Sequence, residues 1–332
     1  MTPDSSRPLV DPELAPFLEL LPFVELTDEA LPAMRERSFP LPFDPALAET
    51  VSRTVRAIPG PPGAPDVSVS CYRPKDTEGA LPCILHIHGG GFILGSATEM
   101  QGPHLALTAA LGCAIVSVDY RLAPEAPFLG SVEDCYAALA WLNAHPDLAA
   151  VDASRIGVMG ESAGGGLAAA LALLARDRSE HRLAFQHLIY PMLDDRTSCV
   201  GAADLHPFAG EFVWPHANNR FGWRALLGAE PGGDDVSPYA APARATDLAG
   251  LPPTYIATGA LDLFVDEDLD YGRRLMRAGV PVEMHVYPGA FHAFDFVPDA
   301  DVSIRARRDS LASLERCLKG PGGAGASGDS AV

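Results

Sequence analysis

Several features of membrane, disulfide-bonded and metal-binding proteins are missing from this sequence. No run of about 18 or more apolar residues occurs, so no membrane span is predicted. The first residues show no basic stretch followed by an apolar run, so no signal peptide is predicted. The six cysteines are scattered without a C-x-x-C pair, which favours reduced thiols in a core. Together these absences predict a cytoplasmic protein.

Basic residues and metal-binding patterns are also scarce. The chain has 24 Lys and Arg against 43 Asp and Glu, a formal net charge of −19. This charge disfavours nucleic acids and anionic membrane surfaces as partners. No H-E-x-x-H sequence and no paired Cys/His spacing occurs, so no metal site is predicted.

Apolar runs that are typical of buried strands alternate with helical patterns over most of the chain. Strands are expected at 66–72, 82–87, 113–118, 155–159, 185–190, 253–258 and 282–287, and helices at 131–143, 163–175, 266–278 and 301–318. The alternation predicts an α/β fold, with a doubly wound, mostly parallel sheet and helices on both faces. Residues 66–72 alternate polar and apolar, which indicates an antiparallel edge strand.

Two segments depart from this alternation. Residues 1–56 are rich in proline and acidic residues and contain short helical patterns at 12–21 and 29–37. Residues 194–236 have no strand pattern and carry large aromatic residues, among them Phe212, Trp214, Phe221 and Trp223. We expect both segments to form a helical cap over a core made of residues 57–193 and 237–319. The tail, 320–332, has nothing to bury and is expected to be disordered.

The sequence from Gly160 to Gly164 reads G-x-S-x-G and lies between an expected strand and an expected helix. This pattern is typical of a turn so sharp that only glycine fits on both sides of the serine. Such a turn exposes the Ser162 hydroxyl beside the amides of a helix N-terminus. A serine needs a base, and the base needs a carboxylate, before the hydroxyl becomes a good nucleophile.

In this type of sheet the catalytic residues follow one another in the chain order nucleophile, acid, histidine, which limits the candidate partners of Ser162. Only His285 and His292 follow the last candidate acid, and His285 lies within an expected strand, so His292 in the following loop is the expected base. Asp262 follows the strand at 253–258 and is the expected acid. It could instead be only a helix N-cap, and Asp266 is the nearest rival for the acid.

A glycine loop is expected to stabilise negative charge on the substrate. His88 to Phe92 reads HGGGF and directly follows the strand at 82–87. We expect the backbone amides of this loop and of the residue after the serine to form an oxyanion hole, with His88 bracing the loop. The alternative is a merely flexible turn. The expected oxyanion donors are Gly89, Gly90, Gly91 and Ala163, and the expected pocket walls are Phe92, Phe212, Trp214 and Phe291.

In combination, these blocks resemble the bacterial hormone-sensitive lipase family of α/β-hydrolases. The matching blocks, in order, are HGGGF at 88–92, DYRLAPE at 119–125, GESAGG at 160–165, DLFVDED at 262–268 and GAFHAF at 289–294. The resemblance implies an eight-stranded sheet with a helical cap, carboxylester hydrolysis through an acyl-enzyme, no cofactor, and the triad Ser162, Asp262 and His292. Glu161 stands where many members have aspartate, and the passage APFLGSVED at 126–134 also departs from the usual pattern.

The expected activity is hydrolysis of small esters with short acyl chains, acetyl to hexanoyl, because bulky aromatics of the cap can narrow the pocket. The same triad can attack amides, lactones or acetylated groups, so an amidase, a lactonase or a deacetylase stays open. A ligand-binding protein is a further alternative, since the plant gibberellin receptors resemble this family yet lack the catalytic histidine. The presence of Ser162, Asp262 and His292 counts against it.

The last expected strand, 282–287, predicts a homodimer. In this fold the final strand lies at an open sheet edge, and here it offers one acidic side chain and no lysine to prevent pairing. Members of the resembled family commonly pair through this strand. The alternative is a monomer in which the C-terminal helix or the loop around Pro298 covers the edge.

Overall fold

The computed structural model describes residues 5–20, 24–37, 44–146, 150–199 and 205–319. Its centre is one eight-stranded sheet with the order β1-β2-β4-β3-β5-β6-β7-β8. β2 is antiparallel to both of its neighbours, and the strands from β4 to β8 are parallel to one another. The predicted fold class is therefore confirmed. The strands are β1 Val51–Ile58, β2 Val67–Pro74, β3 Leu81–Ile87, β4 Ala114–Asp119, β5 Val151–Glu161, β6 Gln186–Ile189, β7 Thr254–Gly259 and β8 Val282–Tyr287.

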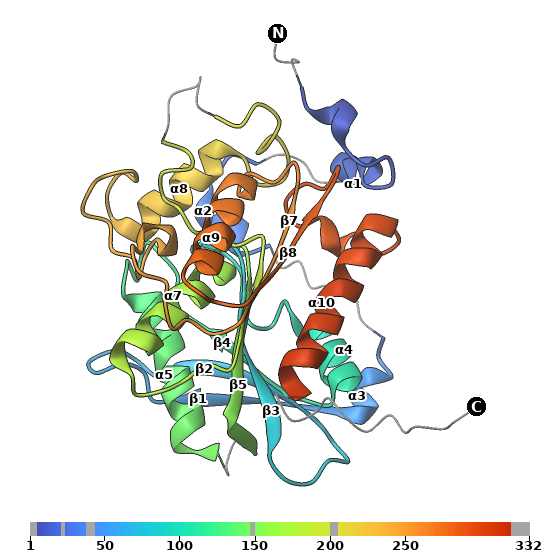
Figure 1. The fold of residues 1–332 in the computed structure, drawn as a ribbon, viewed down its shortest axis with the longest axis vertical. Coiled ribbons are helices and arrows are strands. Elements are labelled where there is room, and N and C mark those ends of the chain that lie inside the picture. The colour runs from blue at the N-terminus through green and yellow to red at the C-terminus, as the bar shows by residue number, and fades with distance from the viewer. Residues whose placement is uncertain (1–4, 21–23, 38–43, 147–149, 200–204, 320–332) are drawn as a thin grey trace.

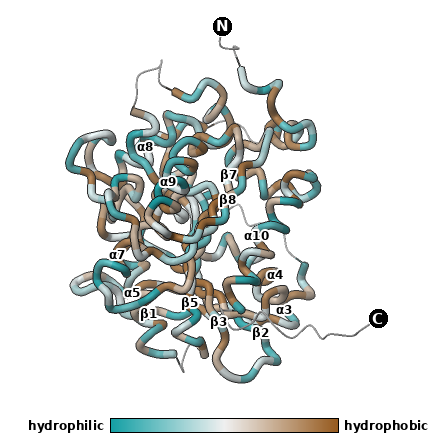
Figure 2. Tube along the Cα trace, viewed as in Figure 1, coloured by the Kyte–Doolittle hydropathy of each residue, from teal (hydrophilic) through white to brown (hydrophobic). Residues whose placement is uncertain are grey.

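Helices cover both faces of the sheet (Figure 1). α5 (Gly130–Ala144), α7 (Ala163–Arg178) and α9 (Val265–Arg277) lie on one face, and α3 (Leu47–Thr50), α4 (Gln101–Leu111) and α10 (Asp301–Lys319) lie on the other. Side chains of successive strand residues face the two helical layers alternately: Leu85 packs in the cluster with α5 and α7, and Ile84 packs with α4 and α10. This double burial explains why the central strands read as nearly continuous apolar runs (Figure 2).

The strand β1 and the helix α4 were not predicted. β1 forms the edge of the sheet, so the prediction that residues 1–56 contain only cap helices is wrong for Val51–Arg56, and β2 is not an edge strand. Four successive residues of β1, 54–57, are exposed, and this polar edge strand has no alternating apolar pattern. α4 was also missed, because its run of small and apolar residues has no clear polar face.

The N-terminal segment packs against α8 (His216–Leu227). α1 (Ala15–Leu20) and α2 (Leu31–Arg35) lie within the two predicted helical patterns and are shorter than them. Asn218 of α8 accepts a hydrogen bond from the Leu26 amide (2.9 Å) and donates one to the Val24 carbonyl oxygen (3.0 Å). Within 194–199 and 205–236 no strand occurs, whereas the predicted disordered tail, 320–332, lies outside the described residues. Among the helices that the structure describes, none is long and apolar enough to cross a membrane.

Candidate active site

The site is built around the turn between β5 and α7. Ser162 occupies this turn with φ 55° and ψ −123°, a backbone conformation that non-glycine residues rarely adopt. The Ser162 amide donates to Ile189 O (2.9 Å) and its carbonyl oxygen accepts from Met192 N (2.9 Å), so the loop after β6 holds the turn in place. A Cβ atom on Gly164 would lie 2.1 Å from Ile87 O, which shows why this position needs glycine. The hydroxyl is thereby fixed at the carboxyl end of β5.

The structure brings together the serine, histidine and carboxylate expected from the sequence. His292 Nε2 lies 2.9 Å from Ser162 Oγ, and His292 Nδ1 lies 2.8 Å from Asp262 Oδ2. All three side chains are buried. With its Nδ1–H donated to the carboxylate, the neutral imidazole presents Nε2 as the acceptor for the serine proton. Asp262 itself is held by the Phe264 amide, which donates to Oδ1 (3.0 Å).

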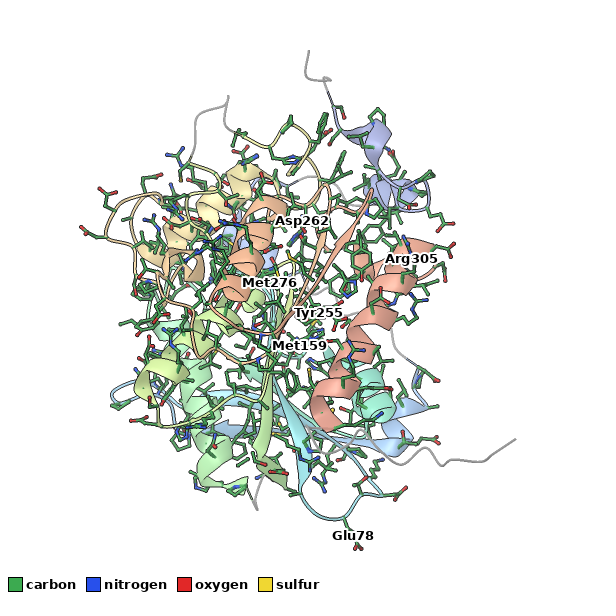
Figure 3. All side chains as sticks on the ribbon, in the orientation of Figure 1. Glu78, Met159, Tyr255, Asp262, Met276 and Arg305 are labelled. Carbon is green, nitrogen blue, oxygen red and sulfur yellow. The ribbon has the colours of Figure 1, made fainter. Side chains whose placement is uncertain are left out.

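The rival residues lie elsewhere. Asp266 is exposed on the first turn of α9. His285 lies in β8, and its Nε2 atom lies 3.0 Å from Glu283 Oε1. It makes no hydrogen bond to Ser162 or Asp262. Figure 3 shows Asp262 at the end of the sheet beside the start of α9, the position expected for the acid.

Two aromatic residues that the sequence did not single out enclose the His292 ring. The ring centroids of Tyr190 and Phe264 lie 4.7 Å and 5.2 Å from it, both in edge-on geometry. The Tyr190 hydroxyl in turn donates to Asp295 Oδ1 (2.6 Å). These contacts orient the imidazole and limit its exposure to water. Tyr190 and Asp295 are about a hundred positions apart, so no local pattern indicates their pairing.

Asp295 is expected to make the stability of the protein pH-dependent. Burial raises the pKa of its carboxyl group to about 6, above the value of about 3.9 of an unfolded aspartate. Between these two pKa values the folded state binds more protons than the unfolded state does. The free energy of unfolding therefore falls as the pH rises through about 6. Asn keeps an oxygen acceptor for Tyr190 and has no charge to bury. We expect Asp295→Asn to raise the melting temperature by about 2–5 °C at pH 8 and by much less at pH 4.5. Equal increases in melting temperature at pH 8 and at pH 4.5 would contradict a raised pKa of Asp295.

The glycine loop after β3 lies against the serine. Gly90 and Gly91 have positive φ, 117° and 60°, and a Cβ atom on Gly91 would lie 2.2 Å from the Trp214 ring. Within the described part of the chain, the amides of Gly89, Gly90, Gly91 and Ala163 have no hydrogen-bond acceptor. Free amides beside a nucleophile can bind an oxyanion.

His88 braces this loop, as predicted. Its Nδ1 donates to Gly89 O (2.8 Å), and its ring stacks on Tyr120 at 4.3 Å between centroids. Tyr120 Oη donates to the His88 carbonyl oxygen (3.0 Å). Burial lowers the pKa of His88 to about 4, so the ring is neutral at physiological pH. His88 therefore fixes the loop and carries no charge.

A pocket of about 320 Å³ opens beside Ser162 and His292. Of the four residues expected to line the pocket, Trp214 does so and Phe92, Phe212 and Phe291 do not; the three loop glycines, expected as oxyanion donors, also lie on its wall. Phe92 packs on Trp223 in the core (5.1 Å between centroids), and Phe212 packs on the fully buried Phe291. The remaining apolar walls, which sequence reasoning missed, are Leu94, Met100, Tyr190, Ala293 and Phe296. The three phenylalanines are close to the site in sequence, but Phe92 and Phe291 are buried in the core and Phe212 is half-buried against Phe291.

Glu161, directly before the serine, is paired beneath the pocket. His86 Nε2 lies 2.9 Å from Glu161 Oε2, and His86 Nδ1 lies 3.1 Å from Ser117 Oγ. Among the residues that the structure describes, no group of three or more His, Cys, Asp or Glu residues could hold a metal ion.

Comparison with known proteins supports the fold described above. Residues 84–296 match the family described as alpha/beta hydrolase fold. "Esterase LipI" of Mycobacterium tuberculosis is 35% identical over 293 residues, covering 87% of this chain and 88% of that protein. "Carboxylesterase NlhH" of the same organism is 33% identical over 324 residues, covering 95% of this chain and 98% of that protein. The solved structure of "Bacterial Heroin Esterase" superposes with a TM-score of 0.85 at 41% identity, covering 95% of this chain and 99% of that chain.

Proposed function

The chain belongs to the α/β hydrolase fold family, and we propose that within this family it is a serine carboxylesterase. One observation carries this proposal: Ser162, His292 and Asp262 form a buried hydrogen-bonded series beside backbone amides that have no other acceptor. The relatives with "esterase" in their names match nearly the whole chain, which supports ester hydrolysis over amide hydrolysis.

Each residue of the site has a defined part in the proposed reaction. Ser162 Oγ attacks the ester carbonyl carbon while His292 Nε2 takes its proton. The carbonyl oxygen becomes negatively charged and is bound by the amides of Gly90, Gly91 and Ala163, with the Gly89 amide beside them. When the carbon–oxygen bond to the alcohol breaks, His292 returns the proton to the departing alcohol. A water molecule, activated by the same imidazole, then releases the acid from Ser162.

We expect short acyl chains to react fastest. The catalytic pocket is only about 320 Å³, and Trp214 of the cap closes against the glycine loop. A long acyl chain would have to displace this contact. Turnover of p-nitrophenyl esters from acetate to palmitate should therefore be highest between acetyl and hexanoyl. Faster turnover of the palmitoyl than of the butanoyl ester, in a detergent-free assay, would contradict the prediction.

Assembly and location are further proposals. β8 lies at the sheet edge, and Val286 in it is 41% exposed, which supports a two-fold homodimer through this strand. Light scattering should give about twice the chain mass of 35.0 kDa, and a value near the single mass would contradict pairing. The cytoplasmic location stays a prediction that fractionation of cells would test.

A further inference from the structure

A second, larger cavity adjoins the catalytic pocket. This lateral cleft, of about 520 Å³, lies between α4, α10 and the face of the sheet that these helices cover, and η3 (Phe294–Phe296) closes part of it. Met159, on the cleft wall, is seen in Figure 3 between the sheet and α10. Small-molecule sites typically enclose about 300–1,000 Å³, so the cleft is large enough to hold part of a substrate.

The cleft and the catalytic pocket share three wall residues. Met100, Glu161 and Phe296 line both cavities. Glu161 directly precedes Ser162, and Phe296 follows His292 by four positions, so the shared wall lies next to the reacting groups. The cleft therefore lies directly beside the reacting groups, with these three side chains at the boundary between it and the catalytic pocket.

The wall of the cleft favours an apolar occupant. Most of its lining side chains are apolar, and its charged groups already have partners. Glu161 is paired with His86 (2.9 Å), Asp295 accepts from Tyr190 (2.6 Å), and the exposed Asp44 accepts from the Ala46 amide (2.9 Å). The Arg307 guanidinium donates to the Val297 carbonyl oxygen (3.1 Å). Burial holds the pKa of His104 well below its usual range, so this ring is uncharged. The cleft thus offers apolar surface with its acidic groups engaged elsewhere, and burying apolar groups there is favourable.

The proton transfers of the reaction indicate which end of an ester enters the cleft. His292 must lie beside the oxygen of the departing alcohol in order to protonate it. The alcohol carbons therefore begin next to His292, and Phe296, four residues farther on, lines both the catalytic pocket and the cleft. Leu94 and Trp214, which line only the catalytic pocket, are left for the acyl group.

We propose that the lateral cleft binds the apolar alcohol portion of the ester, so that the preferred substrates are short-acyl esters of alkyl or arylalkyl alcohols. This inference rests on the proposed esterase activity. The enzyme would then select the two parts of the ester independently. The pocket beside Trp214 would accept only short acyl groups, and the space between α4 and α10 would accept a wider range of alcohols.

The test uses acetate esters of linear alcohols from ethanol to octanol, followed by acid release in a pH-stat. For the wild type, kcat/KM should rise about fourfold for each methylene group that enters the cleft. Ala106 and Ala110 are exposed residues of α4 on the cleft wall. Ala106→Trp should lower the hexyl-to-ethyl ratio about tenfold or more. Ala110 lies one helical turn (~6 Å) farther from Met100, so Ala110→Trp should lower kcat/KM only for the esters of longer alcohols.

Ala109→Trp is the matched control, since Ala109 is an exposed residue of the same helix that does not line the cleft. It should keep the wild-type kcat/KM for every ester of the series, ethyl acetate included. Identical profiles for Ala106→Trp and Ala109→Trp would overturn the proposal. It would also be overturned if Ala106→Trp changed the acyl preference in a p-nitrophenyl ester series and left the alcohol preference unchanged. Failure of the wild type to hydrolyse any ester would instead refute the proposed function.

Discussion

Ser162→Ala is expected to lower kcat for p-nitrophenyl butanoate by about 10⁴-fold or more. The alanine has no oxygen to attack the carbonyl carbon, so no acyl-enzyme forms. The residual rate then comes from the oxyanion amides and from substrate binding alone. The assay is release of p-nitrophenol by purified wild type and variant at equal concentration.

The folded state should survive this substitution. Ser162 Oγ has His292 as its hydrogen-bond partner, and the turn is held mainly by backbone hydrogen bonds to the loop after β6. We expect the melting temperature to change by only a few degrees. Ser179→Ala is the control: Ser179 is an exposed residue at the other end of α7 and should keep full activity. A Ser162→Ala protein with more than a tenth of the wild-type rate would show that another nucleophile is used.

Local sequence patterns were sufficient for the parts of the site that follow from chain geometry. A strand, a G-x-S-x-G turn and a helix dictate where Ser162 lies, because the backbone has few ways to connect these elements. The loops after β7 and β8 must end at the same edge of the parallel sheet, which brings Asp262 and His292 to Ser162. These residues were therefore predictable from order and spacing.

The walls of the cavities were not predictable in this way. Phe296 and Met100 meet beside the serine only after α4, η3 and α10 have packed on the sheet, and such contacts leave no periodic signal in the sequence. Phe92 illustrates the opposite error: it belongs to the HGGGF motif, but its side chain is buried against Trp223. Edge strand β1 was missed for a related reason, since a strand exposed along half its length has no buried face for alternation to reveal.

Asp262→Asn is expected to lower kcat by about 10⁴-fold with little change in the fold. An asparagine amide group at this position donates to Nδ1 of His292, and the ring then carries its proton on Nε2. In that tautomer Nε2 faces Ser162 Oγ as a donor and cannot accept the serine proton. The variant also has no negative charge to stabilise the imidazolium that forms during attack.

Asp266→Asn provides the decisive comparison, because Asp266 was the rival acid and lies four residues away on the same segment. Its side chain is exposed on α9, so we expect kcat and KM to remain within about twofold of the wild type. Both variants change one carboxylate to an amide and shift the net charge equally, so long-range electrostatics cannot account for a difference between them. Equal losses in the two variants would contradict the assignment of Asp262, and a loss confined to Asp266→Asn would transfer the role to that residue.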